Sequence, residues 1–414
     1  MDKRILTILI IVIGFVMGFV LSANFARAGC VSEHYDFHCG DIVNESCVMN
    51  LDLNSSGTCF HIITNNTFVD CNQHSIHLQT PNPYLYGIMS LFNENITITN
   101  CKIDNFWDAG ILLDHVTKGA IINNTVFNNR GIGILLTASS EILVERNNVS
   151  YNGFSGMRLD MSSYNDSIIN NLAEGNHIHG IVLIEGIQNT TVVNNTARNN
   201  HQAGILLQSA SVNNYVANND LSRNWLYGLA IFYNADNNTL LKNKIDSSGQ
   251  YGVYISSSKN NIFVDSIIFN SSLGDVYSCD EMNGEVYNTL LNVSFNKDKV
   301  NVTNGTIYVK WYLDVYVQEV NGTPINNAQV TLIDMFNNRQ DFFTGQDGTI
   351  PRSIVEEYSQ DSQGKSYTNF YHIIVRKFGF YSVSKYLHVF GNEFVSATLR
   401  RIARPPPVKA DSID

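Results

Sequence analysis

The sequence reads Gly110-Ile-Leu-Leu113, Gly133-Ile-Leu-Leu136 and Gly204-Ile-Leu-Leu207, and variants of this motif recur from Gly87 to Gly274. The steps between successive glycines are 23, 23, 23, 24, 24, 24, 24 and 22 residues. The glycines that mark the repeat are Gly87, Gly110, Gly133, Gly156, Gly180, Gly204, Gly228, Gly252 and Gly274. A fixed period of this length is typical of a solenoid, in which each repeat stacks on the next.

Each repeat contains short runs of β-forming residues, such as Ile142-Leu-Val144, separated by Asn, Gly and Ser. These three residue types favour turns, because they tolerate left-handed backbone or bond to their own backbone. None of the repeats holds a helical pattern of about ten residues or more, which argues against leucine-rich and ankyrin repeats. The sequence therefore predicts an all-β parallel β-helix with one repeat per coil. The residues one and three after each glycine should point inward.

Two columns of polar residues support this stacking. Nine positions before the glycines the sequence has Cys101, Asn124, Asn147, Asn171, Asn195, Asn219, Asn243 and Asp265. Four positions before them it has Phe106, Asn129, Asn152, Asn176, Asn200, Asn224, Ser248 and Asn270. Equal offsets lie above each other in a solenoid. We therefore expect the Asn side chains to pass amide hydrogen bonds from coil to coil, as Asn ladders do in cross-β stacks.

The Gly-Ile-x-Leu and Asn-Asn pattern resembles the right-handed parallel β-helix repeat of pectate lyases and many surface proteins. The opening, from Ser56-Gly-Thr-Cys-Phe-His-Ile62 to Phe68-Val-Asp-Cys-Asn-Gln-His-Ser-Ile76, resembles the first coils of NosD-like β-helix proteins. The resemblance covers roughly residues 45–400 and implies a right-handed, single-stranded, pectin-lyase-like solenoid. NosD-like proteins are common on archaeal surfaces, and part of the group is linked to copper delivery to nitrous oxide reductase. One scaffold hosts many activities, so the resemblance says more about fold than about function.

The composition changes after residue 305. Trp311-Tyr-Leu-Asp-Val-Tyr-Val317 and Ala328-Gln-Val-Thr-Leu-Ile333 alternate as strands with a turn between them, and such short strands predict a β-sandwich. A Gly-x-Pro-x-x-x-Ala-x-Val motif begins at Gly322 and is followed by Asp347-Gly348. This motif resembles the carboxypeptidase-regulatory-like, Ig-type sandwich, which implies a spacer or a second binding domain.

We predict five segments along the 414 residues. They are residues 1–28, a signal peptide or N-terminal membrane anchor; 29–55, a Cys-rich cap; 56–305, the β-helix; 306–401, the sandwich; and 402–414, a disordered tail. The first segment has Lys3 and Arg4, an apolar run over residues 5–21 and an Ala26-Arg-Ala28 exit, the pattern of a secretory signal. We therefore expect an exported protein, either released or displayed on the cell surface, with residues 5–21 as the anchor if they are retained.

Five of the seven cysteines lie between Cys30 and Cys71. Outside the cytoplasm, cysteines are more often paired in disulfides than bound to metal. Cys71 and Cys101 fall near equivalent turns of adjacent coils, which favours their pairing. The odd count leaves one cysteine over, and Cys279 is the candidate.

The formal net charge is −11, and the chain has no basic cluster. This charge argues against nucleic acid and against an anionic membrane surface as partners. About fifteen N-x-Ser/Thr sequons, including Asn148 and Asn194, predict a glycoprotein in a glycosylating organism. The repeat itself also places Asn-Asn-Thr at turns, and we expect the ladder to shield sequons such as Asn194.

The repeat also predicts surface columns. Residues three and one before the glycines include His177, His201 and Trp225, and His179, Tyr227 and Tyr251. If all six side chains face outward, they form one strip over about four coils. Aromatic rings pack on the apolar faces of sugars, so this strip is a candidate binding site for an extracellular or cell-surface glycan. Rings that point inward or only cover a turn would give the same columns.

Three carboxylates are candidates for catalysis. Asp114 and Asp160 share the fourth position after the glycine two coils apart, so their backbones should lie roughly 9.6 Å apart. That separation is near the upper end for the two carboxyl groups of inverting glycosidases, and Glu185 in the next coil could replace one of them. Solenoids carry many solvated carboxylates, however, and the chain lacks the clustered Asp pairs of polygalacturonases and the Ca²⁺-binding Asp cluster of pectate lyases.

Copper is the one cofactor that the residues suggest. Imidazole and thiolate suit copper or zinc, and His177 and His201 are the candidate ligand pair. The chain has no Met-rich or His-rich tract. The sequence therefore favours a structural or carbohydrate-binding module without a cofactor. A polysaccharide-degrading enzyme and a NosD-like copper accessory remain the alternatives.

Overall fold

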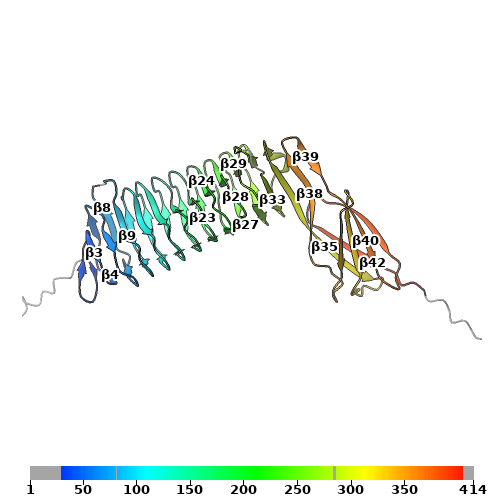
Figure 1. Cartoon of the computed structure of the whole chain (residues 1–414), viewed down its shortest axis with the longest axis horizontal. Coiled ribbons are helices and arrows are strands. Elements are labelled where there is room, and N and C mark those ends of the chain that lie inside the picture. Colours follow the sequence, from blue (N-terminus) through cyan, green and yellow to red (C-terminus); the bar gives the residue numbers. More distant parts are fainter. Residues whose placement is uncertain (1–28, 81, 283–285, 404–414) are drawn as a thin grey trace, which may run out of the picture.

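The computed structural model describes residues 29–80, 82–282 and 286–403. These residues form an elongated solenoid of stacked coils, followed by a smaller domain set at an angle to it (Figure 1). The only helical element among them is the short 3₁₀ helix η1 (Lys297–Lys299). No helix in the described part of the chain has the length and hydropathy needed to cross a membrane. The predicted signal peptide or anchor, residues 1–28, lies outside the described residues.

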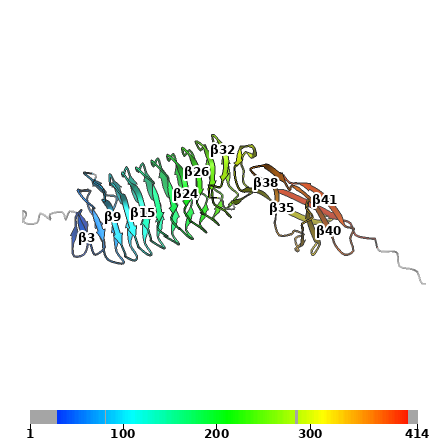
Figure 2. The same ribbon diagram turned by 45° about the horizontal axis from the view of Figure 1, so that its top comes forward.

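Strands of successive coils pair in parallel to form three long sheets along the solenoid (Figure 2). Sheet 1 contains β3 (Asp41–Val43), β6 (Phe60–Ile62), β9 (Tyr86–Leu91), β12 (Ala109–Asp114), β15 (Ile132–Thr137), β18 (Met157–Asp160), β21 (Ile181–Ile184), β24 (Ala203–Gln208), β26 (Tyr227–Phe232), β29 (Tyr251–Ser256), β32 (Gly274–Cys279) and β34 (Val300–Val302). The strands from β9 to β32 start at or within one residue of a repeat glycine.

The other two sheets close each coil. Sheet 2 contains β4 (Cys47–Met49), β7 (Phe68–Asp70), β10 (Thr97–Thr99), β13 (Ala120–Ile122), β16 (Leu143–Glu145), β19 (Ser167–Ile169), β22 (Thr191–Val193), β25 (Tyr215–Ala217), β27 (Thr239–Leu241), β30 (Ile262–Val264), β33 (Tyr287–Leu291) and the start of β35 (Thr306–Glu319). Sheet 3 contains β5 (Leu53–Ser55), β8 (Ser75–Leu78), β11 (Lys102–Asp104), β14 (Thr125–Phe127), β17 (Asn148–Ser150), β20 (Leu172–Glu174) and β23 (Thr196–Arg198). It continues through a bridge at Asp220 to β28 (Lys244–Asp246) and β31 (Ile267–Phe269).

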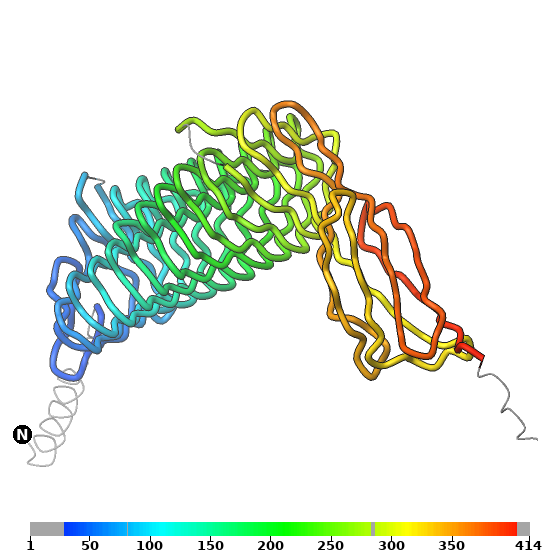
Figure 3. Tube along the Cα trace, turned by 45° about the vertical axis from the view of Figure 1, so that its right-hand side comes forward, coloured from blue at the N-terminus to red at the C-terminus, as the bar shows by residue number. Residues whose placement is uncertain are grey.

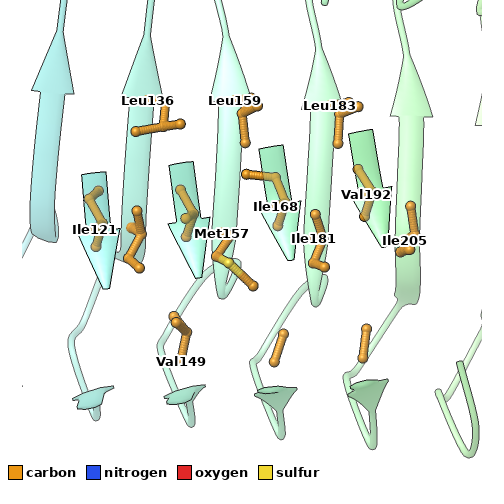
Figure 4. Packing of buried hydrophobic residues seen from close by; sticks show 14 of the residues in the cluster. Ile121, Leu136, Val149, Met157, Leu159, Ile168, Ile181, Leu183, Val192 and Ile205 are labelled. Atoms are coloured by element: carbon orange, nitrogen blue, oxygen red, sulfur yellow. The ribbon is translucent and has the colours of Figure 1, made fainter. Parts of the chain in front are cut away.

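The repeat glycines are required by packing inside the coil. A Cβ atom on Gly133 would lie 2.2 Å from Cγ1 of Val149 in sheet 3 and 2.8 Å from the side-chain amide of Asn152. Any larger residue would push sheets 1 and 3 apart. The next inward positions are filled as predicted, because Ile111 and Leu113 are fully buried. Figure 4 shows how such aliphatic side chains stack from coil to coil within the solenoid.

Both predicted Asn ladders are present. In the first, the side-chain amide of Asn171 donates to Oδ1 of Asn195 at 3.0 Å. In the second, Asn176 donates to Oδ1 of Asn200 at 3.1 Å. Several ladder residues are preceded in the sequence by another Asn, which adopts the left-handed conformation of the turn. Asn194, directly before Asn195, has a φ of 57°. Asn194 is exposed, so the expectation that the ladder shields this sequon is wrong.

A third ladder was not predicted. It runs through Asn214, Asn238, Asn261 and Asn288, each of which donates its amide to a carbonyl of the preceding coil. Two coils before Asn214, the equivalent position is occupied by Asp166. Its Oδ1 accepts the backbone N–H of Ile142 at 2.9 Å. Burial raises the pKa of Asp166 to about 7.

An antiparallel cap covers the first coil. β1 (Cys30–Val31) pairs with β2 (Asp36–Phe37) and with β4, so the cap covers a sheet edge that could otherwise pair with another chain. Three disulfides hold this end, namely Cys30–Cys47, Cys39–Cys59 and the predicted Cys71–Cys101. Cys279 is the free cysteine, as expected, and it is buried. The first coil starts at β3, before residue 56, because residues 41–55 already pair in parallel with the next coil although they lack the repeat glycine.

The C-terminal domain consists of two antiparallel-rich sheets over one core. β35 pairs with β38 (Ser353–Asp361) and β42 (Glu393–Leu399), and β38 pairs with β39 (Gly364–Tyr367). The opposite sheet has the order β37 (Arg339–Phe343), β36 (Gln329–Asp334), β40 (Phe370–Arg376) and β41 (Val383–His388). Val315, Val330 and Ile373 are among the buried residues between them. The Ig-type resemblance stays a prediction.

A buried carboxylate joins this domain to the solenoid. Glu357 is 2% exposed and accepts hydrogen bonds from Lys297 Nζ at 2.6 and 2.8 Å and from Trp311 Nε1 at 2.6 Å. β35 runs without interruption from sheet 2 into the sandwich, so the predicted boundary at residue 306 falls at the start of one shared strand. Figure 3 shows the bend at this junction.

Candidate functional site

Three of the predicted ligand-binding residues lie side by side at the turn between sheets 3 and 1. The ring centroids of His177 and His201 are 4.9 Å apart, and those of His201 and Trp225 are 4.2 Å apart. We call these three residues the turn strip. Trp225 is 61% exposed, which leaves most of its indole available to a ligand.

The turn strip lines a shallow hollow of about 400 Å³. The residues that complete its lining are Ile178, Gln202 and Leu226, each of which follows a member of the strip in the sequence. The hollow therefore combines rings, aliphatic carbon and one amide. These three residues were not predicted as ligand-binding residues. The sequence did show that all three stand two positions before a repeat glycine.

Glycines end the column on either side of the turn strip. Gly153 precedes His177 in the column and Gly249 follows Trp225. A Cβ atom on Gly249 would lie 1.9 Å from the Trp225 carbonyl oxygen and 3.2 Å from the indole Cδ1. The close backbone contact requires glycine here, and the absence of a side chain leaves that side of the indole uncovered by the column.

His179 does not belong to the strip. Its Nδ1 accepts the backbone N–H of Ala203 at 3.1 Å, so the ring forms a hydrogen bond with the first residue of strand β24. Burial lowers the pKa of His179 to about 4, and the nearby Arg158 charge acts in the same direction. The expectation of an outward-facing ligand-binding imidazole at this position is wrong, because the ring folds back on the strand edge.

Tyr227 and Tyr251 lie in a separate aromatic cluster on the outer face of sheet 1. The ring of Tyr227 is 4.8 Å from that of Tyr254, and Tyr251 is 4.8 Å from Tyr277. Phe232 also belongs to this sheet-face cluster, at 5.2 Å from Tyr254. Burial is the largest cause of the raised pKa of Tyr227 and Tyr251. The single predicted strip is thus two surfaces, a turn strip and a sheet-face cluster.

The sequence contained a signal for one of the two additional tyrosines. Tyr254 stands two positions after Gly252, an outward position of the repeat. Tyr277 stands three positions after Gly274, a position that the repeat marks as inward. Its pairing in register with Tyr254 became visible only in the structure, because the strand shifts by one residue relative to the glycine column there.

The three candidate carboxylates are held by neighbouring basic groups. Asp114 and Asp160 both pair in register with Thr137, which places them two coils apart as predicted. Asp114 Oδ1 is 2.6 Å from Nδ1 of His115. Arg158 donates from Nε to Asp160 Oδ2 at 3.0 Å, and its Nη2 lies 4.0 Å from Glu185.

Arg158 therefore stands between Asp160 and Glu185. The two carboxyl groups of an inverting glycosidase need the space between them for a water molecule, whereas here Arg158 contacts both Asp160 and Glu185. Asp160 keeps one buried oxygen, Oδ1, without a protein hydrogen-bond partner. Taken together, these contacts make the group an ion-pair cluster on the outer face of sheet 1.

The two candidate imidazoles, His177 and His201, are neighbours in the turn strip. In residues 29–80, 82–282 and 286–403, no group of three or more His, Cys, Asp or Glu side chains is arranged to hold a metal ion. Cys39 is in a disulfide with Cys59, so its sulfur is not available as a thiolate ligand.

The fold and these surfaces define a right-handed parallel β-helix protein. The family described as "right handed beta helix region" matches residues 44–197, 86–244 and 167–321, which together span more than half of the chain. The chain therefore belongs to this family. No curated protein matches the sequence.

Solved structures with the same fold are distant in sequence. The A-module of mannuronan C-5 epimerase AlgE4 from Azotobacter vinelandii has 15% identity and a TM-score of 0.51, covering 68% of this chain and 84% of that chain. The AlgE6 A-module from the same organism has 16% identity and a TM-score of 0.51, covering 63% and 86%. Dettilon tailspike protein has 12% identity and a TM-score of 0.50, covering 80% and 72%. At this identity the likeness is one of fold.

Proposed function

We propose that this chain is an exported β-helix protein that binds an extracellular polysaccharide through the turn strip, without a cofactor. The observation that carries the proposal is the row of His177, His201 and Trp225 in three successive coils, lining one hollow. Stacked coils are about 4.8 Å apart, a spacing comparable to the length of one sugar residue in an extended polysaccharide. A chain lying along the solenoid axis could therefore present one sugar to each ring.

The chemistry of the hollow suits a sugar. Apolar walls with a few polar groups are typical of small-ligand sites. Here Trp225, Ile178 and Leu226 offer apolar surface to the C–H face of a pyranose. The imidazoles and the amide of Gln202 offer hydrogen bonds to its hydroxyl groups.

Export is supported by the three disulfides at the N-terminal end, because such bonds persist in oxidising compartments. The mannuronan epimerase module acts, by its name, on a polysaccharide, which supports only that this scaffold is compatible with such a ligand. The formal charge of −11 favours neutral over anionic chains.

The test is binding of the chain from residue 29 onward to immobilised polysaccharides, with release of reducing ends followed in parallel. Trp225→Ala should weaken binding by about tenfold or more, and His201→Ala should weaken it to a smaller extent. Trp107→Ala is the matched control, because Trp107 occupies the same column, is 38% exposed and lies against Arg130, away from the hollow. Equal binding by the parent and Trp225→Ala would overturn the proposal.

The same experiment separates binding from catalysis. Release of reducing ends that is lost in Asp160→Asn would make the chain an enzyme, and the ion-pair cluster would become its active site. Binding without product release would leave the carboxylates as a structural group.

A further inference from the structure

The outer face of the sandwich carries an aromatic surface that is separate from the β-helix sites. Along β40, Tyr371 and Ile373 point into the sandwich core and are buried. The alternate residues of that strand, Phe370 and His372, therefore point outward. His372 on β40 pairs in register with Tyr386 on the neighbouring strand β41.

These outward rings contact one another across the two strands. His372 and Tyr386 are stacked with centroids 4.5 Å apart and planes at 20°. Phe370 is 5.6 Å from Tyr386, with planes at 13°, and 5.0 Å from His388. With Phe390, which lies 6.5 Å from His388, they make up what we call the sandwich aromatic face.

Much of this surface is in contact with solvent. Tyr386 is 67% exposed and Phe390 is 60% exposed. β41 is the last strand in the sheet order, so no further strand covers its outer edge in the described part of the chain. Contiguous exposed apolar surface of this kind marks an interaction site more often than chance exposure does.

Polar groups border and interrupt the rings. His372 Nε2 lies 2.5 Å from Oγ of Ser384, next to Tyr386 along β41. Toward the far edge of the same sheet, Arg339 donates two hydrogen bonds to Asp341, at 2.8 and 2.9 Å. The face thus alternates ring surface with groups that donate or accept hydrogen bonds.

We propose that the sandwich aromatic face is a second glycan-binding surface that takes a neutral polysaccharide. A sugar ring has an apolar C–H face and a rim of hydroxyl groups, which matches rings bordered by imidazole, hydroxyl and charged groups. A dry protein partner would have to supply hydrogen bonds to the His388 imidazole, because burying a polar group without them is costly. The net charge of −11 disfavours an anionic lipid surface.

The proposal goes beyond the turn strip and stands on different residues. Two surfaces on one chain would raise its avidity for a long polysaccharide without any new contact. The Glu357 contacts at the junction hold the sandwich to the solenoid, so both surfaces are carried together.

The test is affinity electrophoresis of the chain from residue 29 onward in native gels containing hydroxyethyl cellulose, galactomannan or xylan. The variants are Tyr386→Ala, Tyr386→Thr, which keeps a strand-forming residue, and Phe370→Ala. Tyr381→Ala is the matched control, because Tyr381 is 60% exposed on the same domain and makes none of the ring contacts described. Thermal melting establishes that each variant is folded.

We expect the parent to be retarded by at least one of the three polysaccharides, and Tyr386→Thr and Phe370→Ala to show at least threefold weaker retardation than Tyr381→Ala. Equal retardation of these variants and the control would overturn the proposal, as would a parent that none of the three polysaccharides retards. Binding to phosphatidylcholine vesicles that is lost in Tyr386→Ala would reassign the face to a membrane and overturn it as well. If Trp225→Ala loses retardation and Tyr386→Thr does not, the sandwich aromatic face is rejected as a binding surface and the turn strip is kept. If Tyr386→Thr loses retardation and Trp225→Ala does not, the turn strip is rejected and the sandwich aromatic face is kept.

Discussion

Oδ1 of Asn195 accepts two hydrogen bonds from Asn171 in the preceding coil, one from its backbone N–H at 2.9 Å and one from its side-chain amide at 3.0 Å. Both residues are almost fully buried, at 3% and 1% exposure. Each step of the ladder satisfies buried polar groups of two coils at once. The solenoid therefore depends on an unbroken Asn column, and the surfaces proposed to bind glycans depend on the coils that this column aligns.

Replacing a ladder residue should destabilise the fold strongly. In Asn171→Leu or Asn195→Leu, the neighbouring coils keep buried groups without partners, at a cost of about 1–3 kcal/mol for each group. Thermal or urea unfolding measures the loss. Asn148→Leu is the control, because Asn148 is the same residue type on strand β17 with an exposed side chain. A ladder variant with the same unfolding midpoint as Asn148→Leu would contradict the stabilising role of the ladder.

Asp166 should make the stability depend on pH. Burial holds its pKa at about 7 in the folded chain, whereas an unfolded Asp titrates near about 4. Between these values the folded state binds more protons than the unfolded state, so stability falls as pH rises. Asp166→Asn removes this titration and supplies an amide like that of Asn214, which donates to the Ile187 carbonyl at 3.1 Å.

We therefore expect Asp166→Asn to melt at a higher temperature than the parent at pH 8, with a difference that shrinks toward pH 4. Asp298→Asn, at a carboxylate that is 95% exposed, should show no such pH-dependent gap. A constant difference across this pH range would show that Asp166 does not titrate there.

The Cys71–Cys101 disulfide should stabilise the N-terminal coils. It joins residues 30 apart in the sequence, directly after strand β7 and directly before strand β11. A bridge of this span stabilises by about 2–4 kcal/mol, mainly by restricting the unfolded chain. The double variant Cys71→Ser/Cys101→Ser should therefore unfold at a lower urea midpoint. A midpoint equal to that of Cys279→Ser, which removes only the buried free thiol, would contradict this expectation.

Glu357 should hold the sandwich to the solenoid. Glu357→Ala leaves Lys297 and Trp311 without their shared acceptor, and breaking a buried ion pair costs about 3–5 kcal/mol. The value should lie at the low end, because the Lys297 side chain is 30% exposed. Calorimetry should show the sandwich unfolding before the β-helix. Arg339→Gln removes an exposed ion pair of the sandwich instead. It should change the free energy of unfolding of the sandwich by no more than about 1 kcal/mol.

The solenoid was predictable because its signals repeat. One glycine such as Gly133 says little, but nine at a nearly constant step identify a packing position that every coil shares. The ladder through Asn214 and Asn238 was missed because its column changes residue type at Thr190 and Asp166. The signal was nevertheless present at a constant offset of fourteen before the glycine in these four coils.

The binding surfaces were harder to predict, because a column gives a position and leaves the ring orientation open. His179 and Tyr227 share an offset, yet His179 accepts a backbone N–H while Tyr227 packs in an aromatic cluster. The rotamer depends on neighbours in the next coil, such as Ala203 and Tyr254. The sandwich aromatic face was readable as Phe370-x-His372 and Tyr386-x-His388, but strand pairing was needed to bring these two segments together.

The central claim is that a polysaccharide binds along the turn strip. The most direct measurement is the dissociation constant of the parent, Trp225→Ala and Trp107→Ala for the polysaccharide that the parent binds most tightly, determined by isothermal titration calorimetry. We predict that Trp225→Ala weakens binding by about tenfold or more, a loss of about 1.4 kcal/mol, while Trp107→Ala leaves it unchanged. Equal dissociation constants for the parent and Trp225→Ala would contradict the account.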